Sequence, residues 1–471
     1  MSLLRLKPFN ADLAADTGLK RCLTAFDLTL LGIGAIIGAG IFVLTGLAAA
    51  TQAGPAIVLS FVVAGIACAS AALAYAELAA SVGGCGSAYG YAYAGLGEII
   101  AWIIGWDLIL EYGLATPTVA IGWSGYVNNA LTAMGMGLPE YLLHAPGEIT
   151  DKLPMGGMVN LPAALIMLFL AILLSIGVRE SARFNAIVVA IKLIAIAVFV
   201  SVSVFYINPE NWQPFMPFGW NGVMAGAALI FFAYIGFDAV STAAEEAINP
   251  QRDLPIGIMV SLAFCTLIYM VVAGLLTAVA PYHTLKVASP VADVMLRLGH
   301  AWAAGLIAAG AIAGLTTVML VLYYALTRVF LAMSRDGLLP PMFASVNAHT
   351  KTPVRIIIVS GIVMATVAGF TPLQKVAELV NIGTLAAFVL VCAGVLAMRI
   401  RHPDLHRPFR APLGAFFPLL GITSCVYLML SLPWITWERF AIWLIIGLVI
   451  YFSYSRQHST VGIDASVSCK N

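Results

Sequence analysis

Charged side chains are scarce in this chain. Only 10% of its 471 residues are Asp, Glu, Lys or Arg, whereas a soluble domain carries about a quarter. The 23 basic and 22 acidic residues nearly balance, and no basic patch interleaved with aromatic residues occurs. The composition therefore argues against a soluble domain and against a nucleic-acid partner.

The chain also lacks the usual signatures of metal and disulfide chemistry. It has no CxxC or HExxH pattern, and its seven histidines fall in loops or tails. Its seven cysteines are an odd number, and none falls in a loop that we expect outside the cell. We therefore expect no disulfide framework, no metal and no cofactor. A nucleophile with a base is missing as well, so we expect no enzyme.

Long apolar runs, by contrast, are abundant. The chain is 61% hydrophobic, and its mean hydropathy is +0.98. A helix that crosses a hydrocarbon core ~30 Å thick needs about 20 apolar residues. Twelve runs of this length predict an all-α membrane protein with twelve transmembrane helices, which we number as spans 1 to 12. They lie at 26–51, 54–80, 97–126, 160–178, 183–206, 222–247, 256–280, 301–334, 354–372, 376–398, 412–432 and 438–455.

The distribution of Lys and Arg predicts the orientation. With the N-terminus inside, seventeen of these residues lie in cytoplasmic segments and five in outside segments, and Lys192 belongs to neither side. Basic residues favour the cytoplasmic side. We therefore expect a multi-pass protein of the plasma membrane with both termini in the cytoplasm. The start of the chain is too long and too acidic for a cleavable signal peptide.

Three loops carry further signals. Ser289 and Pro290 stand at a helix-start position in segment 281–300, which predicts a short interfacial helix. The Gly- and Tyr-rich segment 83–98 is expected to be half-buried and to close the inner side. Segment 127–159 is expected to hold partial helix at most.

Two of the spans contain breaks at their centres. Span 1 crowds four glycines into nine residues, and span 6 carries Gly236 and Asp238 where an ordinary span is apolar. An unwound helix leaves backbone groups without partners at several kcal/mol each, so it persists only where it lines a cavity. Glycines also allow close helix packing, but this clustering favours a break. A matched pair of broken spans predicts a transporter binding site. The span 1 glycines are Gly32, Gly34, Gly38 and Gly40.

The two breaks offer opposite polarity to a ligand. The N–H groups of Gly38, Ala39 and Gly40 stand at the start of a half-helix, where the helix dipole favours a carboxylate. The freed carbonyls near 232–235 can accept hydrogen bonds from an ammonium group. Together the two breaks fit a zwitterion, and a free amino acid is the expected substrate.

Ionisable residues inside spans are costly and indicate function. Burial disfavours the charged form of Lys192, which predicts either a proton carrier that docks against the span 1 break or a permanent structural clamp. Asp238 either takes part in proton coupling, pairs with a substrate amine or caps an exposed backbone N–H. Glu111, with Asp107 one turn earlier on the same face, is expected to tune or contact the substrate site.

Several longer motifs resemble one known family. GIGAIIGAGIF in span 1, SARFNAIVVAIK in span 5, FFAYIGFDAVSTAAEEAINPQRDLPIGI across span 6 and SRDGLLP after span 8 resemble the amino acid–polyamine–organocation superfamily. Within it they resemble bacterial members of the cationic amino acid transporter subfamily. The resemblance covers essentially the whole chain, 1–471, as one transporter domain. It implies two inverted five-helix repeats, at about 26–206 and 222–398, with extra helices at about 412–455.

The resemblance also implies roles for individual residues. The substrate carboxylate would meet Ile36 and Gly38 to Gly40, and the substrate amine would meet the carbonyls of Phe232, Ala233 and Ile235. Lys192 matches the family lysine associated with proton coupling. The family often has Ser or Thr where this chain has Ala39, so one hydroxyl contact is missing.

These observations predict a proton-coupled symporter of small neutral L-amino acids such as alanine, working by alternating access. Leu322 aligns with the side-chain wall and is bulky and apolar, which disfavours a long cationic side chain; Glu111 is the candidate partner for such a cation. Uptake of cationic amino acids, exchange and a non-transporting sensor are the alternatives. Sodium coupling through Thr316 and Thr317 is disfavoured because Lys192 would repel the ion. The expected partners are an amino acid, a proton and membrane lipid.

Overall fold

The protein is an all-helical membrane protein. The computed structural model describes residues 5–6, 23–81, 87–148, 156–176, 182–244, 247–345, 347 and 352–460. Every regular element in these ranges is a helix, and eight helices are long and apolar enough to cross a membrane. Three further apolar helices in the same ranges are shorter, with 10–17 residues. The first long run, Ala25–Ser81, covers both span 1 and span 2; the count of twelve spans stays a prediction.

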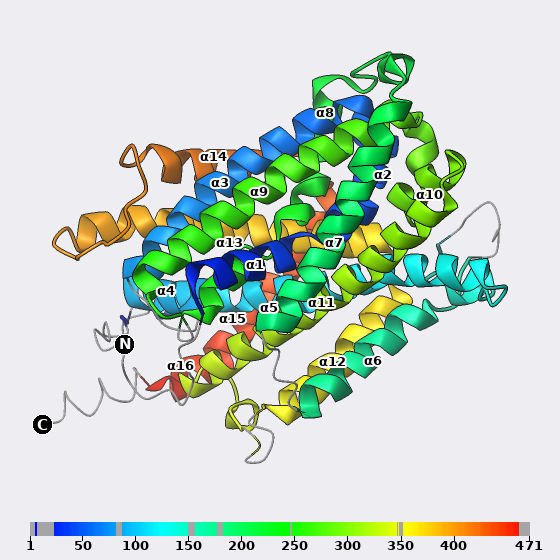
Figure 1. Cartoon of the computed structure of the whole chain (residues 1–471). Helices are drawn as coiled ribbons and strands as arrows, with labels where there is room; N and C mark the ends of the chain where they lie inside the picture. Colours follow the sequence, from blue (N-terminus) through cyan, green and yellow to red (C-terminus); the bar gives the residue numbers. More distant parts are fainter. Residues whose placement is uncertain are drawn as a thin grey trace, which may run out of the picture.

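The helices form two packed groups (Figure 1). The first group holds both broken spans and packs α3 and α1 against α9; its members are α1 (Ala25–Ile36), α2 (Thr45–Ala48), α3 (Ile57–Ser81), α8 (Gly219–Ile230) and α9 (Pro250–Val279). The second group packs α5 against α11 and α6 against α12; its members are α5 (Glu98–Ala133), α6 (Leu161–Ile176), α11 (Ala301–Arg335) and α12 (Val354–Phe370).

Other helices bridge or flank these groups. Helix α7 (Ala182–Ser203) packs against both α1 and α11, and α13 (Leu373–Arg401) packs against both α3 and α5. The remaining described α-helices are α4 (Ser87–Gly95), α10 (Pro290–Arg297), α14 (Phe416–Leu430), α15 (Trp434–Ile450) and α16 (Arg456–His458). The two bridging helices thus connect the group that carries the breaks to the group that does not.

Most helix bounds lie within a few residues of the predicted spans. Helix α10 begins at Pro290 directly after Ser289, as predicted. Helix α9 begins at Pro250, six residues before the predicted start of span 7, because proline suits the first helical position and Asp253 accepts a hydrogen bond from the Asn249 N–H at 3.3 Å. In the Tyr-rich segment 83–98, α4 buries its three tyrosines; residues 82–86 lie outside the described ranges.

Candidate functional site

Span 1 is broken where its glycines crowd. Helix α1 ends at Ile36, the backbone of Ile37 is extended with ψ of 98°, and the chain coils again as the π-helix η1 (Gly40–Leu44). A Cβ on Gly40 would stand 2.2 Å from the Cα of Ala233. Only glycine allows this close approach, so the second half of span 1 rests directly on the backbone of span 6.

Span 6 is broken over a longer stretch. After α8 the chain forms two 3₁₀ segments, η7 (Phe231–Tyr234) and η8 (Asp238–Ala243), separated by a turn. Gly236 in this turn has φ of +116°, a conformation that side chains disfavour. The predicted interruptions are therefore present in both spans, and they face each other.

Asp238 is fully buried and holds the span 6 turn. Its Oδ1 accepts a hydrogen bond from the Gly236 N–H at 3.2 Å, and its Oδ2 accepts one from the Tyr112 hydroxyl of α5. Of the three roles predicted for this carboxylate, the geometry is that of a cap on an exposed backbone N–H. The same contact with Tyr112 ties the span 6 break to the second helix group.

Lys192 lies against the span 1 break, as the sequence predicted. Its fully buried Nζ donates hydrogen bonds to the carbonyls of Gly34 at 2.6 Å and Ile37 at 3.0 Å. These two carbonyls belong to the last turn of α1 and to the extended residue that follows it, and the break leaves no helical N–H groups ahead of them. The ammonium group thus replaces the hydrogen bonds that the break removes.

Tyr269 joins the two breaks, and sequence reasoning missed it. Its hydroxyl in α9 lies 2.7 Å from the carbonyl oxygen of Ile36 and 2.8 Å from that of Ala233. The hydroxyl has a single proton to share between these two acceptors. A tyrosine in the middle of an apolar span needs a partner for its hydroxyl, and that need was the signal available in the sequence.

A small cavity lies between the breaks. It measures about 10 Å³, close to the space that one water molecule needs. Of the predicted substrate residues, Ile36, Gly38, Ala39, Gly40, Phe232, Ile235 and Leu322 line it. Ala35, Val119 and Val318 line it as well, and the sequence did not point to them. Every lining residue is apolar or glycine, so recognition of polar groups at this cavity falls to the backbone.

Two predicted substrate residues do not line the cavity. Ala233 packs under Gly40 and turns its carbonyl to Tyr269. Glu111 is fully buried in α5, eight residues and roughly 12 Å along the helix from Val119. Neither oxygen of its carboxyl group has a hydrogen-bond partner among the described residues. Glu111 therefore lies outside the lining of this cavity, and its role at the substrate site stays a prediction.

The threonines proposed for a sodium ion are neighbours in α11, and each hydroxyl donates within that helix. The Thr316 hydroxyl donates to the Ile312 carbonyl at 2.7 Å and accepts from the Trp123 indole at 3.0 Å. The Thr317 hydroxyl donates to the Gly314 carbonyl at 2.8 Å. The Lys192 stem packs on Gly314, since a Cβ there would stand 3.1 Å from its Cδ. Within the described ranges no group of three or more His, Cys, Asp or Glu could hold a metal ion.

The fold and the site define a class of protein. Two broken membrane helices, meeting around a cavity whose polar groups are backbone N–H and C=O, are the arrangement by which secondary transporters bind small solutes. The apolar helices make this a multi-pass membrane protein.

The chain belongs to the amino acid permease family, whose family model matches residues 23–452. It is 50% identical over 462 residues to the branched-chain amino acid permease BcaP of Bacillus subtilis, covering 97% of this chain and 98% of that protein. It is 48% identical over 461 residues to the methylthioribose transporter of the same organism, covering 97% and 99%. It is 31% identical, over an alignment of 578 positions that includes gaps, to human cationic amino acid transporter 4, and the alignment covers 97% of this chain and 90% of that protein.

These comparisons confirm the resemblance seen in the motifs. The chain is an amino acid transporter of the amino acid–polyamine–organocation superfamily, related to the cationic amino acid transporters. The family and the relatives are permeases and transporters, so the prediction that the chain is no enzyme is confirmed as well.

Proposed function

We propose that this protein takes up small neutral L-amino acids, alanine-like in size, together with a proton by alternating access. The apolar lining of the cavity carries the proposal. Val119, Val318 and Leu322 supply side chains around it, and none of them can pair with a charged substrate side chain. The half-helix start at Gly38 to Gly40 offers N–H groups to the carboxylate, and the Phe232 and Ile235 backbone lies opposite for the amine.

The larger branched-chain amino acids are the second candidate substrates. A relative that is 50% identical is named as a branched-chain amino acid permease, and the valine and leucine side chains of the wall suit an aliphatic group. The cavity must widen to admit any amino acid, because about 10 Å³ holds only one water molecule. Cationic amino acids are disfavoured because Glu111 does not reach the cavity.

The proposed proton site is Lys192, with Asp238 as a second coupling residue. A charged Lys192 clamps the end of α1 through Gly34 and Ile37. Loss of its proton removes the charge that strengthens these hydrogen bonds, and it frees the span 1 break to move. Sodium is disfavoured as the coupling ion because the ammonium group already occupies the space between spans 1 and 8.

The proposed topology places both broken spans at the start of a repeat. Both termini lie in the cytoplasm, and the chain comprises two inverted repeats, 26–206 and 222–398, followed by helices at 412–455. The half-helices of spans 1 and 6 move as part of the first helix group. Exchange of one amino acid for another uses the same architecture and is separated from symport by the experiment below.

Uptake into proteoliposomes tests the proposal. Labelled alanine, leucine and lysine are supplied with and without an inward proton gradient, to wild type and to Lys192→Ala. We expect the gradient to drive accumulation of alanine and leucine but not of lysine. We expect Lys192→Ala to lose gradient-driven accumulation while retaining counterflow of preloaded amino acid. The exposed Lys286→Ala is the matched control and should behave as wild type.

The outcomes are distinct. Wild-type uptake that ignores the gradient removes proton coupling, and Lys192→Ala that still accumulates substrate under the gradient removes the role of this lysine. Binding without uptake or counterflow identifies a sensor. Lysine uptake that exceeds alanine and leucine uptake restores the cationic alternative.

A further inference from the structure

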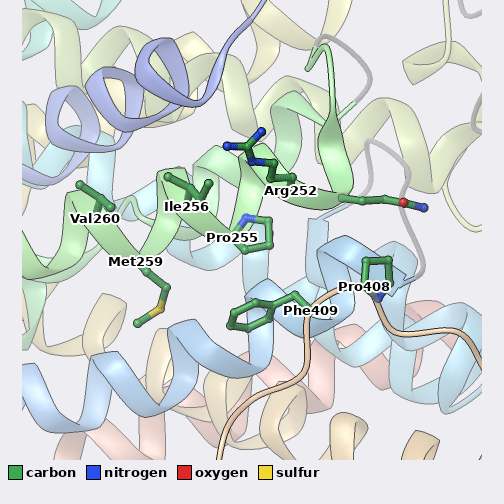
Figure 2. Close-up of a pocket in the computed structure, with 8 residues that line it drawn as sticks. Arg252, Pro255, Ile256, Met259, Val260, Pro408 and Phe409 are labelled. Carbon is green, nitrogen blue, oxygen red and sulfur yellow. The ribbon is translucent and has the colours of Figure 1, made fainter.

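A groove far from the substrate cavity opens on the side of α9. It measures about 500 Å³ and lies between the first turns of α9 and the loop 402–415 that joins α13 to α14 (Figure 2). Pro255 and Met259 form one wall, and Pro408 and Phe409 form the other. In Figure 2 the side chain of Met259 extends from α9 on the side where the Phe409 ring lies. Volumes of 300–1,000 Å³ are typical of ligand sites.

The loop wall of this groove is held in place. The Glu77 carboxylate of α3 accepts a hydrogen bond from the Ala411 N–H at 2.8 Å and lies 3.6 Å from the Arg407 Nε. These two contacts bracket Pro408 and Phe409 in the chain. The groove is therefore a built feature of the fold, because both ends of its loop wall are anchored to a buried carboxylate.

One end of the groove is cationic. Arg252 and Gln251 are exposed at the start of α9 and line the groove. The neighbouring Asp253 turns to the start of its own helix, where its Oδ2 accepts a hydrogen bond from the Asn249 N–H at 3.3 Å. No carboxylate among the described residues pairs with Arg252. Arg410, next to Phe409, adds a second exposed cation to the loop wall.

An apolar stripe runs from this cationic end along α9. Arg252, Ile256 and Val260 recur every four residues and so share one face of the helix, as Figure 2 shows. The same face continues with exposed apolar side chains, whose exposed fractions are 37% for Ile256, 49% for Val260, 39% for Phe264, 59% for Leu267 and 40% for Val271. The stripe therefore faces the hydrocarbon, with its charge at one end.

The geometry points to a binding site for an anionic phospholipid. Its phosphate would meet Arg252 and the Gln251 amide, and its acyl chains would lie along Ile256 and Val260 and in the groove between Met259 and Phe409. One leaflet of the hydrocarbon core is roughly 15 Å deep, about ten residues of helix, which spans Arg252 to Leu262. Basic pockets at the membrane boundary bind anionic headgroups. A free phosphate has no acyl chains, so the apolar stripe would add nothing to its binding.

The groove lies between two elements that are far apart in the sequence. Helix α9 packs with α1 and α3 in the first helix group, whereas loop 402–415 joins α13 to α14. A lipid seated between them contacts both walls at once. Both walls are tied to the first helix group, because Glu77 of α3 anchors the loop; the lipid would therefore brace α9 against loop 402–415.

Lipid retention tests the site. Wild type, Arg252→Gln and Arg335→Gln are reconstituted in equal parts of phosphatidylglycerol and phosphatidylcholine, then partly delipidated, and the retained lipids are counted by native mass spectrometry. Arg335 is the matched control, since it is also exposed at a helix end that we expect in the cytoplasm. A charged hydrogen bond to phosphate corresponds to roughly a ten-fold or greater difference in affinity. We expect wild type and Arg335→Gln to prefer phosphatidylglycerol, and Arg252→Gln to lose that preference about ten-fold.

A second variant separates the groove from simple charge attraction. Met259→Trp fills the groove without changing the charge, so we expect it to retain less phosphatidylglycerol than wild type while it elutes and melts like wild type. Equal retention of the two lipids by wild type overturns the proposal. Retention of phosphatidylglycerol by Arg252→Gln at the wild-type level, or by Met259→Trp at that level, overturns it too.

Discussion

Tyr269 is the residue on which the two broken helices meet. Its hydroxyl lies within hydrogen-bond distance of one carbonyl from each break, those of Ile36 and Ala233. Its ring packs against Phe61, with centroids 5.4 Å apart, and against Tyr234, at 5.5 Å, and these two rings also contact each other. The aromatic contacts fix the ring, and the fixed ring then places the hydroxyl. Tyr269 is therefore a positioning residue that holds the closed form of the site.

Replacement of Tyr269 by Phe should loosen this closed form. The ring contacts remain, but a buried carbonyl loses its donor, which costs about 1–3 kcal/mol. Cys265, fully buried one turn earlier in α9, reports the opening. If its modification follows the population of the open form, alkylation of Cys265 should quicken roughly 5- to 150-fold, as measured by peptide mass spectrometry.

The matched control is a second tyrosine that donates to a backbone carbonyl but lies between two other helices. The Tyr323 hydroxyl donates to the Ile357 carbonyl between α11 and α12, away from both breaks. Tyr323→Phe also removes one buried hydroxyl–carbonyl hydrogen bond, and it should leave the Cys265 rate near that of wild type. Equal acceleration in both variants would show that Tyr269 has only a general stabilising role.

At the scale of elements, the sequence predicts the helices well and the contacts between them poorly. Apolar length alone locates the spans, because hydrocarbon thickness fixes how long a helix must be. Glycine crowding locates the span 1 break, because only a backbone without side chains can rest on Ala233 as Gly40 does. The buried ammonium of Lys192 needs acceptors, and the break supplies them.

The missed residues have a common physical cause. Val119 and Val318 line the cavity, but nothing in an apolar span distinguishes a valine that faces a ligand from one that faces a neighbouring helix. Val318 stands one turn before Leu322 on the same helix face, so that spacing could have predicted it as a lining residue. The prediction for Glu111 rested on its charge inside a span, whereas its distance from the cavity depends on how α5 packs against span 6.

The contact between the two half-helices predicts a strict requirement for glycine at position 40. In Gly40→Ala the new methyl group would stand 2.2 Å from the Ala233 Cα, and a backbone atom cannot turn aside. The half-helices must separate, at a cost of about 1–3 kcal/mol or more. We expect a lower melting temperature and no thermal shift when alanine or leucine is added.

Gly305→Ala is the control for this prediction. A methyl group there meets nothing within 4 Å in the interior of α11. Alanine favours a helix over glycine by about 1 kcal/mol, so this variant should melt at or above the wild-type temperature and keep its ligand shift. The requirement is contradicted if Gly40→Ala melts and binds like wild type.

At the scale of the whole molecule, a buried ion cluster joins the first helix group to α13. Glu77 of α3 is 2% exposed and accepts from Arg399 of α13, whose Nε lies 2.9 Å from Oε1 and whose Nη2 contacts Oε2. Arg399 also donates to the Gly414 carbonyl at 2.5 Å. The cluster thus ties α3, α13 and loop 402–415 together at one end of the bundle, well away from the substrate cavity.

Glu77→Gln should therefore destabilise the protein and loosen loop 402–415. Removal of one partner leaves the guanidinium of Arg399 buried without its counter-charge, which typically costs about 3–5 kcal/mol. We expect a lower melting temperature and faster tryptic cleavage after Arg410, because loop 402–415 loses its anchors. The pair of Asp293 and Arg297, whose side chains are 30% and 43% exposed, is the control, since Asp293→Asn should cost at most about 1 kcal/mol. Cleavage of Glu77→Gln at the wild-type rate would mean that packing alone holds the loop, and that the cluster does not join α3 to α13.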